Sequence, residues 1–350
     1  MASPAPGEWP DAVGQDASDG TGAAAQLAAE SYMGPATFGH RPMLTELADL
    51  IARAPDAAIV GAPWDASTTN RPGARFGPRA LRALTHVNGS YHLDLELEIF
   101  DHLDVVDFGD ALVRHGLWEP SAAAIRGRVQ AVADAGIVPI VIGGDHSITW
   151  PSATAVAGAR GYGSFGLIHF DAHADTAAEI DGNLASHGTP MRRLIESGAV
   201  RGENFVQVGL RGYWPPAETV AWMREQGIRT HFMQELWERG ARAVLDDVIS
   251  EALSGTDAIY LSVDIDVLDP GFAPGTGTPE PGGMAPVDLL RMVRTIAMET
   301  SIVGMDVVEV SPPYDHADIT VNNAHRIVWE ALAGMAYRRR AAPHQEGLNQ

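Results

Sequence analysis

Short, uninterrupted apolar runs recur along this 350-residue chain, separated by stretches with helical character. A run without polar alternation is typical of a strand that is buried on both faces. Such strands alternating with helices predict an α/β fold on a mainly parallel sheet, covered on both sides. The expected strands are residues 57–61, 137–142, 165–170, 205–208, 258–265 and 302–310, and the expected helices are 120–135, 287–300 and 326–338.

The chain shows no linker in its middle and no internal repeat, so residues 29–340 are expected to form a single domain. Residues 1–28 are rich in Ala, Gly, Pro, Asp and Ser and are interpreted as a disordered leader. Residues 341–350 are interpreted as a flexible tail.

Composition excludes several classes of protein. The net charge of −21 argues against nucleic-acid binding, which needs a basic surface, and is compatible with attraction of a cationic substrate or simply with solubility. No apolar run reaches the roughly 18 residues of a membrane span, and no secretion signal opens the chain, so a cytoplasmic location is expected. Because the chain has no cysteine, any metal must be bound by nitrogen and oxygen.

Aspartates and histidines follow three of the expected strands. In an extended segment residues i, i+2 and i+4 point to one side, so Asp171, His173 and Asp175 are presented together. Asp264 and Asp266 share a side in the same way, and His146 follows a neighbouring strand. An isolated aspartate there would be a turn former, but four unpaired carboxylates would repel one another strongly unless a cation were present.

Two imidazoles and four carboxylates exceed the needs of a single zinc site and suit two divalent cations. This donor set favours manganese, although nickel, cobalt or zinc could occupy it. Three nearby residues are interpreted as supporting rather than ligating. They are His169, which lies deeper in its strand, Asp269, which precedes a proline, and Asp145, which could orient a neighbour.

These motifs resemble those of the ureohydrolase (arginase/agmatinase) family. The resemblance extends from about residue 36 to the final helix and rests on segments 143–147 (GGDHS), 171–175 (DAHAD), 262–270 (SVDIDVLDP), 70–78, 186–190, 274–279 and 309–312. It implies a three-layer αβα domain with about eight mostly parallel strands, two manganese ions and a homo-oligomer, a trimer or hexamer. The implied metal ligands are His146, Asp171, His173, Asp175, Asp264 and Asp266.

The resemblance also implies catalytic roles. Asp175 would hydrogen-bond a bridging hydroxide as well as bind metal, Glu309 would pair with a guanidinium, and His187 would carry a proton to the leaving amine. The simpler alternatives are a structural ion pair for Glu309 and an inert loop histidine for His187. Thr278 lies in a loop that could wall the site. Arg71 and Arg75 could equally line the site edge or be structural.

The flanking segments resemble agmatinases more than arginases, which carry an asparagine where this chain has Ala177. The expected reaction is therefore hydrolysis of agmatine to urea and putrescine. Hydrolysis of 4-guanidinobutyrate, 3-guanidinopropionate or guanidine is the alternative. Glu179 and Asp181 could meet the distal ammonium of agmatine or belong to a solvated acidic loop, and Tyr213 and Trp214 could line the channel.

Two other classes remain open from the residues alone. The chain could be a non-catalytic helper subunit that keeps the fold and the metals. It could also be an amide hydrolase of a related fold, although a one-zinc site needs fewer ligands than this chain carries. The number of metal ions per chain separates the amide hydrolase, with one, from the two-metal enzyme.

Overall fold

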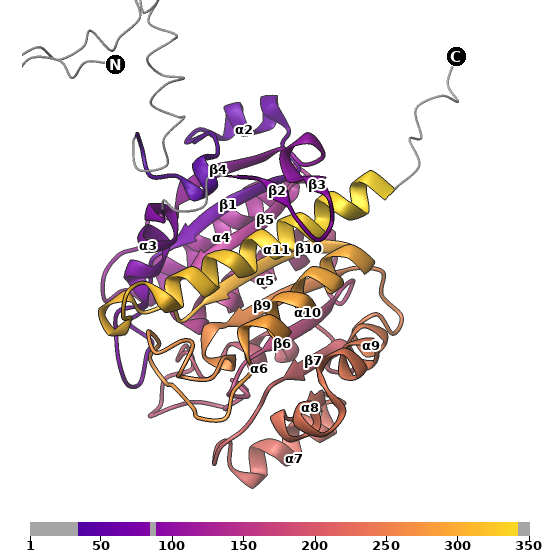
Figure 1. Cartoon of the computed structure of the whole chain (residues 1–350). Coiled ribbons are helices and arrows are strands. Elements are labelled where there is room, and N and C mark those ends of the chain that lie inside the picture. Colours follow the sequence, from indigo (N-terminus) through magenta and orange to yellow (C-terminus); the bar gives the residue numbers. More distant parts are fainter. Residues whose placement is uncertain (1–33, 85–88, 342–350) are drawn as a thin grey trace, which may run out of the picture.

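The computed structural model describes residues 34–84 and 89–341, so the expected leader at 1–28 and residues 342–350 of the expected tail lie outside them. Its centre is an eight-stranded sheet in which all neighbouring strands run parallel (Figure 1). In spatial order the strands are β4 (Val105–Asp110), β1 (Ala57–Ala62), β5 (Val138–Gly143), β10 (Ile302–Val308), β9 (Ile259–Asp264), β6 (Gly166–Phe170), β7 (Phe205–Val208) and β8 (Arg229–His231). The short strands β2 (Tyr91–His92) and β3 (Leu97–Glu98) form a separate antiparallel pair.

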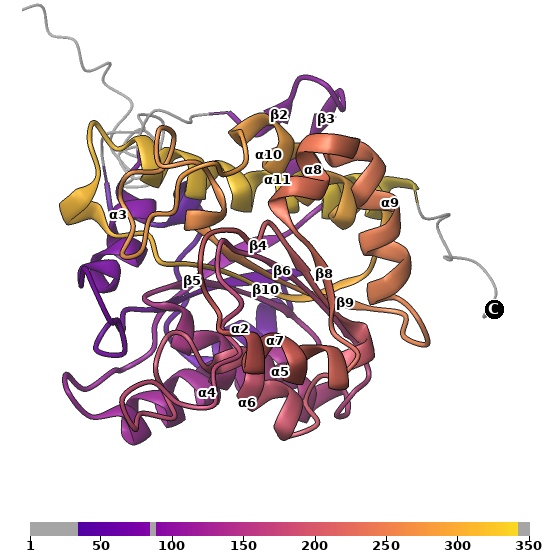
Figure 2. The ribbon, with the colours of Figure 1, turned by 90° about the horizontal axis from the view of Figure 1, so that it is seen from below.

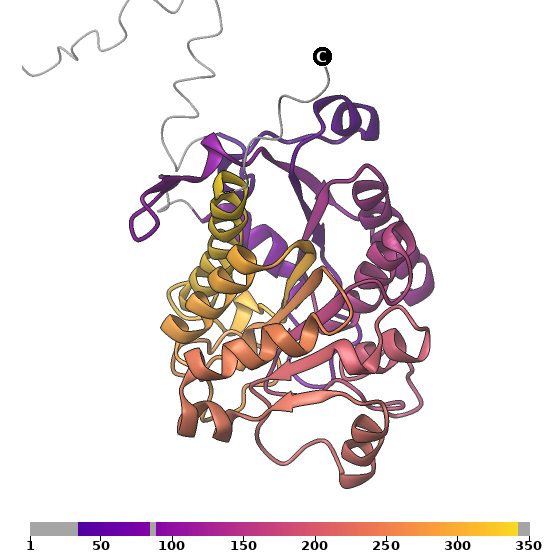
Figure 3. The same ribbon diagram turned by 90° about the vertical axis from the view of Figure 1, so that its right-hand side faces the viewer.

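Helices cover both faces of the large sheet, which gives three layers (Figures 2 and 3). One layer contains α3 (Gly77–Ala83), α8 (Met233–Arg239), α9 (Ala241–Ala252), α10 (Pro286–Glu299) and α11 (Ile319–Ala341). The other contains α2 (Leu47–Arg53), α4 (Trp118–Asp134), α5 (Thr149–Arg160), α6 (Pro190–Glu196) and α7 (Ala217–Glu225). This arrangement confirms the expected αβα architecture.

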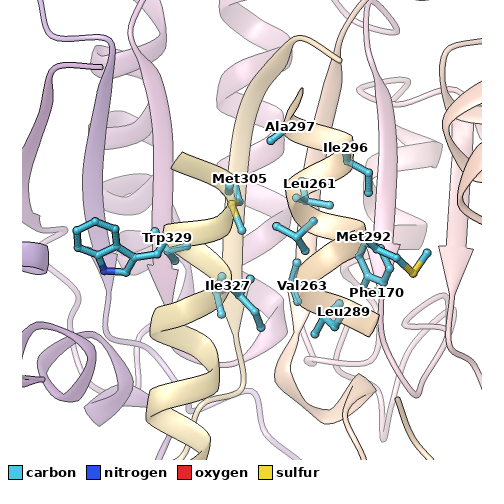
Figure 4. Packing of buried hydrophobic residues seen from close by; sticks show 14 of the residues in the cluster. Phe170, Leu261, Val263, Leu289, Met292, Ile296, Ala297, Met305, Ile327 and Trp329 are labelled. Carbon is cyan, nitrogen blue, oxygen red and sulfur yellow. The ribbon is translucent and has the colours of Figure 1, made fainter. Parts of the chain in front are cut away.

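The two faces of the sheet have separate hydrophobic cores. On one face, α10 presents Leu289, Met292 and Ile296, three or four residues apart, to Leu261 and Val263 of β9 (Figure 4). On the other face, alternate residues of the same strand point toward the layer that contains α5. Strand β9 is buried along its whole length, including the polar side chains of Ser262 and Asp264 on this second face.

Each expected strand lies within two residues of its predicted bounds, and so do helices α4 and α10. Helix α11 begins at Ile319, seven residues before the predicted start at Arg326. The short pair β2 and β3 was not predicted from the sequence. Within the large sheet, β4 and β8 were not predicted either. Both form edges of the sheet, and their sequences are short or interrupted, since β8 has three residues and β4 includes Asp107 and Gly109. Edge strands have one neighbour, so they need less apolar sequence.

Among the described residues, none of the helices combines the length and apolar character that crossing a membrane requires.

Candidate metal centre

The predicted metal-ligating residues follow three of the four central strands of the sheet. Strands β5, β10, β9 and β6 are adjacent and parallel, so their carboxyl ends meet at one edge. His146 opens a 3-10 turn after β5, Asp264 is the last residue of β9, and Asp171 directly follows β6. Glu309 directly follows β10, between them. A ligand site outside the carboxyl ends of strands is the general rule for open α/β sheets.

His146 is the centre of the first donor group. Its ring is fully buried, and its Nδ1 atom faces three carboxylate oxygens. The distances from Nδ1 are 3.1 Å to Asp171 Oδ2, 3.0 Å to Asp175 Oδ2 and 3.1 Å to Asp264 Oδ2. Ligands of one octahedral ion, with bonds of about 2.1 Å at right angles, would lie about 3 Å apart, so this spacing fits a shared cation.

His173 is the centre of the second donor group, nearer the surface. Its Nδ1 lies 3.1 Å from Asp266 Oδ2 and 3.4 Å from Asp171 Oδ1. Asp171 therefore turns one oxygen to each histidine, the arrangement expected of a carboxylate that bridges two cations. The structure thus brings all six predicted ligands together in two groups that share Asp171.

Without metal the cluster is electrostatically unfavourable. Burial, followed by the charges of Asp266 and Asp171, raises the pKa of Asp264 well above its usual value. Burial opposes the charged form of His146, but its hydrogen bonds to Asp171, Asp175 and Asp264 outweigh it and hold the pKa of His146 well above the usual range. Buried carboxylates at this density require compensating positive charge, which two divalent cations would supply.

Metal binding is expected to stabilise the protein more strongly as the pH rises. The raised pKa values of His146, His173 and His187 stabilise the metal-free chain fully below about pH 6.5. This stabilisation is lost as the pH rises through the pKa values of the three histidines in the folded chain. For His187 the folded pKa is about 9. Because divalent cations bind deprotonated imidazole, their affinity rises over the same range. We expect the difference in Tm between manganese-loaded and chelator-treated protein to be larger near pH 9 than near pH 6, and a smaller difference near pH 9 would contradict this.

His169 supports the cluster from within strand β6. Gln207 donates from its Nε2 atom to Ala174 O at 2.7 Å and to His169 Nδ1 at 3.2 Å. Because Nδ1 accepts, the ring hydrogen lies on Nε2, which donates to Asp171 Oδ2 at 2.8 Å. His169 also lies within reach of the first donor group. Because its Nε2 hydrogen is donated to Asp171, His169 orients this carboxylate rather than offering a lone pair to a metal, in agreement with the sequence interpretation.

Arg211 was not singled out from the sequence, because a single loop arginine carries no periodic signal. Its half-buried guanidinium donates to the backbone oxygens of Gly209, Asp266, Val267, Leu268, Glu280 and Pro281. These carbonyls come from the segments that follow β7 and β9 and from the loop that contains Thr278. Arg211 therefore ties the Asp266 backbone to that loop.

A cavity of about 340 Å³ opens beside the two donor groups. Ten described residues line it: Thr69, His173, Asp175, Ile180, Asp181, His187, Gly188, Trp214, Asp264 and Thr278. Thr278 donates to Asp266 Oδ2 at 3.2 Å, so the cavity wall that contains Thr278 is attached to the six predicted metal ligands, which we call the metal-type cluster.

The structure distinguishes within two pairs of residues, Glu179 with Asp181 and Tyr213 with Trp214, that the sequence analysis treated alike. Asp181 lines the cavity, in a tight turn closed by Ile180 and Asn183, whereas Glu179 lines only a neighbouring cavity. Trp214 lines both cavities, whereas the side chain of Tyr213 is fully exposed and lines neither.

His187 and Glu309 form a buried pair next to the cavity. Glu309 Oε1 lies 3.0 Å from His187 Nδ1 and accepts from the His146 backbone N–H at 2.8 Å. Burial opposes charge on His187, but Glu309 and then Asp175 and Asp145 outweigh it and raise the pKa of His187 to about 9. The N–H of Thr69 points at His187 Nε2 from 3.2 Å, a geometry that suits the neutral ring. The neutral and the charged His187 ring therefore differ by a proton on Nε2. This atom lies beside Thr69, which lines the cavity.

Glu309 lies behind the cavity wall rather than in it. Its Oε2 atom is buried and has no hydrogen-bond partner among the described residues. A Cβ on Gly277 would come within 3.3 Å of this oxygen, so the glycine leaves space beside it. Glu309 has a φ of 62° and Asp175 a φ of 51°, left-handed conformations that cost energy outside glycine and often occur at functional sites.

The remaining singled-out residues make contacts of a structural kind. Arg75 forms an ion pair with the buried Asp65, which holds the loop after β1, and Arg71 stacks over Tyr314. Asp145 accepts from the backbone N–H groups of Ser67 and Ser147. Asp269 accepts from Gly271, Gly282 and Gly283, as expected for a turn former.

Residues 55–334 match the sequence profile of the Arginase family. The chain is 39% identical over 306 residues to a guanidinopropionase of Pseudomonas aeruginosa, covering 87% of this chain and 93% of the relative. It is 40% identical over 279 residues to a mitochondrial agmatinase of Gallus gallus, covering 79% and 80%. The chain therefore belongs to the arginase family of ureohydrolases and is a hydrolase of guanidino compounds.

Solved structures agree with this assignment. The proclavaminate amidino hydrolase of Streptomyces clavuligerus superposes with a TM-score of 0.78 at 34% identity, covering 88% of this chain and 99% of that one. A formiminoglutamase of Trypanosoma cruzi, solved with manganese, superposes with a TM-score of 0.75 at 25% identity, covering 83% and 98%.

Proposed function

We propose that this chain hydrolyses agmatine to urea and putrescine with the help of two divalent cations. Manganese is favoured over nickel, cobalt or zinc. The proposed ligands are His146, Asp171, His173, Asp175, Asp264 and Asp266. The charge of the cavity carries this proposal. Asp175, Asp181 and Asp264 line it, and none of its ten described lining residues is an arginine. The chain contains no lysine. Agmatine is positive at both ends, whereas the carboxylate of a guanidino acid would meet neither arginine nor lysine in this cavity.

The bound cations would lower the pKa of water so that hydroxide is available near neutral pH. Asp175 faces both His146 and the cavity, so its carboxylate can accept a hydrogen bond from the attacking nucleophile. The nucleophile adds to the guanidinium carbon, and the bond from that carbon to the substituted nitrogen then breaks as this nitrogen takes up a proton. The added hydroxyl group loses its proton to solvent, which leaves the carbonyl of urea. Urea and a primary amine are the products.

Glu309 and His187 supply the remaining groups. The unpartnered Oε2 of Glu309 is an acceptor that a guanidinium N–H would satisfy, since a buried carboxylate oxygen without a partner is costly. His187 holds a proton on Nε2 in its charged form and can transfer it to the leaving amine. Regaining that proton from water completes the cycle.

A guanidino acid is the second candidate substrate because of the neighbouring cavity of about 590 Å³. The two cavities share Ile180, Asp181 and Trp214 as lining residues, and Arg192 lines the neighbouring one. Arg192 already stacks over Trp222 and pairs with Glu196 at 2.8 Å. A substrate carboxylate would therefore share the positive charge of Arg192 with Glu196.

Urea release from agmatine, 4-guanidinobutyrate, 3-guanidinopropionate, arginine and guanidine by manganese-loaded and nickel-loaded protein tests the proposal. We expect agmatine to have the highest kcat/KM. Faster turnover of a guanidino acid would instead establish the second candidate. No urea from any compound, with two metals bound, would favour a helper subunit, and one bound metal would favour the amide hydrolase.

Replacing Asp181 by asparagine is expected to raise the KM for agmatine by roughly two- to fivefold with little change in kcat. The effect is small because Asp181 is exposed and its attraction to the distal ammonium is screened by water. Steady-state kinetics on agmatine and guanidine provide the measurement, since guanidine lacks the distal charge. Glu179→Gln is the matched control, and an equal rise in KM for that variant would contradict a specific role of Asp181.

The resemblance to the family also leads us to propose a homo-oligomer, a trimer or hexamer, in the cytoplasm. Light scattering coupled to size-exclusion chromatography would measure the oligomeric state.

A further inference from the structure

Three polar side chains extend the metal-type cluster into the core of the sheet. Tyr260 and Ser262 of β9 and Asp306 of β10 are all fully buried. Ser262 Oγ lies 2.9 Å from His146 Nε2 and donates to Asp306 Oδ1 at 2.7 Å. Tyr260 donates from its hydroxyl to Asp306 Oδ2, also at 2.7 Å. These residues form one hydrogen-bonded chain, which we call the His146 relay.

Strand register explains how the relay forms. Tyr260, Ser262 and Asp264 alternate along β9, so all three point to the same face of the sheet. Asp306 lies directly opposite Ser262 on the neighbouring strand β10. The face of β9 that presents Asp264 to the cluster therefore also presents the two hydroxyls that bind Asp306.

The hydrogen bonds set the direction of the relay. Tyr260 and Ser262 each donate a hydroxyl hydrogen to Asp306, whose two carboxylate oxygens accept. A hydroxyl has a single hydrogen, so Ser262 Oγ must accept from His146, which places the ring hydrogen on Nε2. In the deprotonated ring that a metal binds, the lone pair of His146 then lies on Nδ1, the atom that faces Asp171, Asp175 and Asp264.

We propose that Asp306, acting through Ser262, is a positioning residue that holds the His146 ring in its metal-binding tautomer and so strengthens metal binding. A histidine that binds metal through one nitrogen is commonly oriented by a hydrogen bond from the other, and loss of that partner weakens metal affinity by roughly 10- to 100-fold. The inference rests on the proposed role of His146 as a ligand. It assigns function to two residues, Ser262 and Asp306, that contact neither substrate nor metal.

Metal affinity, rather than activity alone, tests the relay. Manganese would be titrated into metal-free protein against a competing chelator for the parent, Ser262→Ala, Asp306→Asn and Tyr260→Phe. We expect roughly 10- to 100-fold weaker binding for the first two variants and a smaller loss for the third, which leaves the Ser262–Asp306 bond in place. Ser121→Ala is the matched control, because this buried serine lies on α4 and hydrogen-bonds to the backbone oxygens of Arg114 and Leu117.

A spectroscopic readout distinguishes positioning from general damage. The visible absorption of cobalt-loaded protein should change in Ser262→Ala and Asp306→Asn but not in Ser121→Ala, and saturating manganese should restore much of the activity. If Asp306→Asn fails to fold, Ser262→Ala decides the question, since it removes a single oxygen atom. Parent-like affinity and spectrum in folded Ser262→Ala and Asp306→Asn would overturn the relay while leaving the proposed function intact. A parent chain that binds no divalent cation would overturn both.

Discussion

Asp266→Ala is expected to lower kcat/KM by roughly 10³-fold or more, because the activated nucleophile depends on the metal pair. Asp266 Oδ2 lies 3.1 Å from His173 Nδ1 and accepts from Thr278, so its loss opens the outer donor group and frees one cavity wall. Bound manganese should fall from about two ions per chain to about one. Urea release and metal analysis of the purified variant provide the two measurements, and His146→Ala should behave similarly through the inner group.

Asp269→Asn serves as the matched control for this loss. It lies three residues further along the same loop, and its side chain accepts from backbone N–H groups outside the cluster. An asparagine keeps only one of the two acceptor oxygens, so the Tm should fall, but the bonds that are lost lie outside the cluster and metal content should stay close to that of the parent. Full activity of Asp266→Ala with metal present would refute the ligand assignment.

Glu309→Gln is expected to lower kcat/KM for agmatine by roughly 10²- to 10³-fold, because breaking a buried charge pair costs about 3–5 kcal/mol. The substitution removes the charge that faces His187 and the proposed acceptor of the guanidinium. Metal content should remain at the parent level, since Glu309 is not among the six proposed ligands. Kinetics and metal analysis of the same preparation give both quantities.

A solely structural role of Glu309 makes a different prediction. In that case Glu309→Gln would lower the Tm while kcat/KM, measured well below the Tm, stayed near the parent value. Glu280→Gln is the comparison variant, because Glu280 contributes its backbone oxygen to Arg211 and does not line the cavity. An equal loss of activity in the two variants would argue against a specific role for Glu309.

Local patterns explain why so much of the donor cluster could be predicted from the sequence. Uninterrupted apolar runs are direct consequences of burial on both faces, so β1, β5, β6, β7, β9 and β10 could be located. The spacing i, i+2, i+4 is equally local and grouped Asp171, His173 and Asp175. The structure presents them from the bend that follows β6 rather than from an extended strand. Edge strands β4 and β8 lack this signal because one neighbour is missing.

The sequence by itself therefore determined the α/β class and the family, and it predicted the six proposed metal ligands at strand ends, since each depends on residues close together in the chain. Only the tertiary structure decided which acidic residue of the 179–181 loop reaches the cavity and that Arg75 pairs with Asp65. It also placed Asp306 beside Ser262, 44 residues away. These outcomes depend on strand order and register, which bring distant residues within 3 Å and which no local pattern encodes.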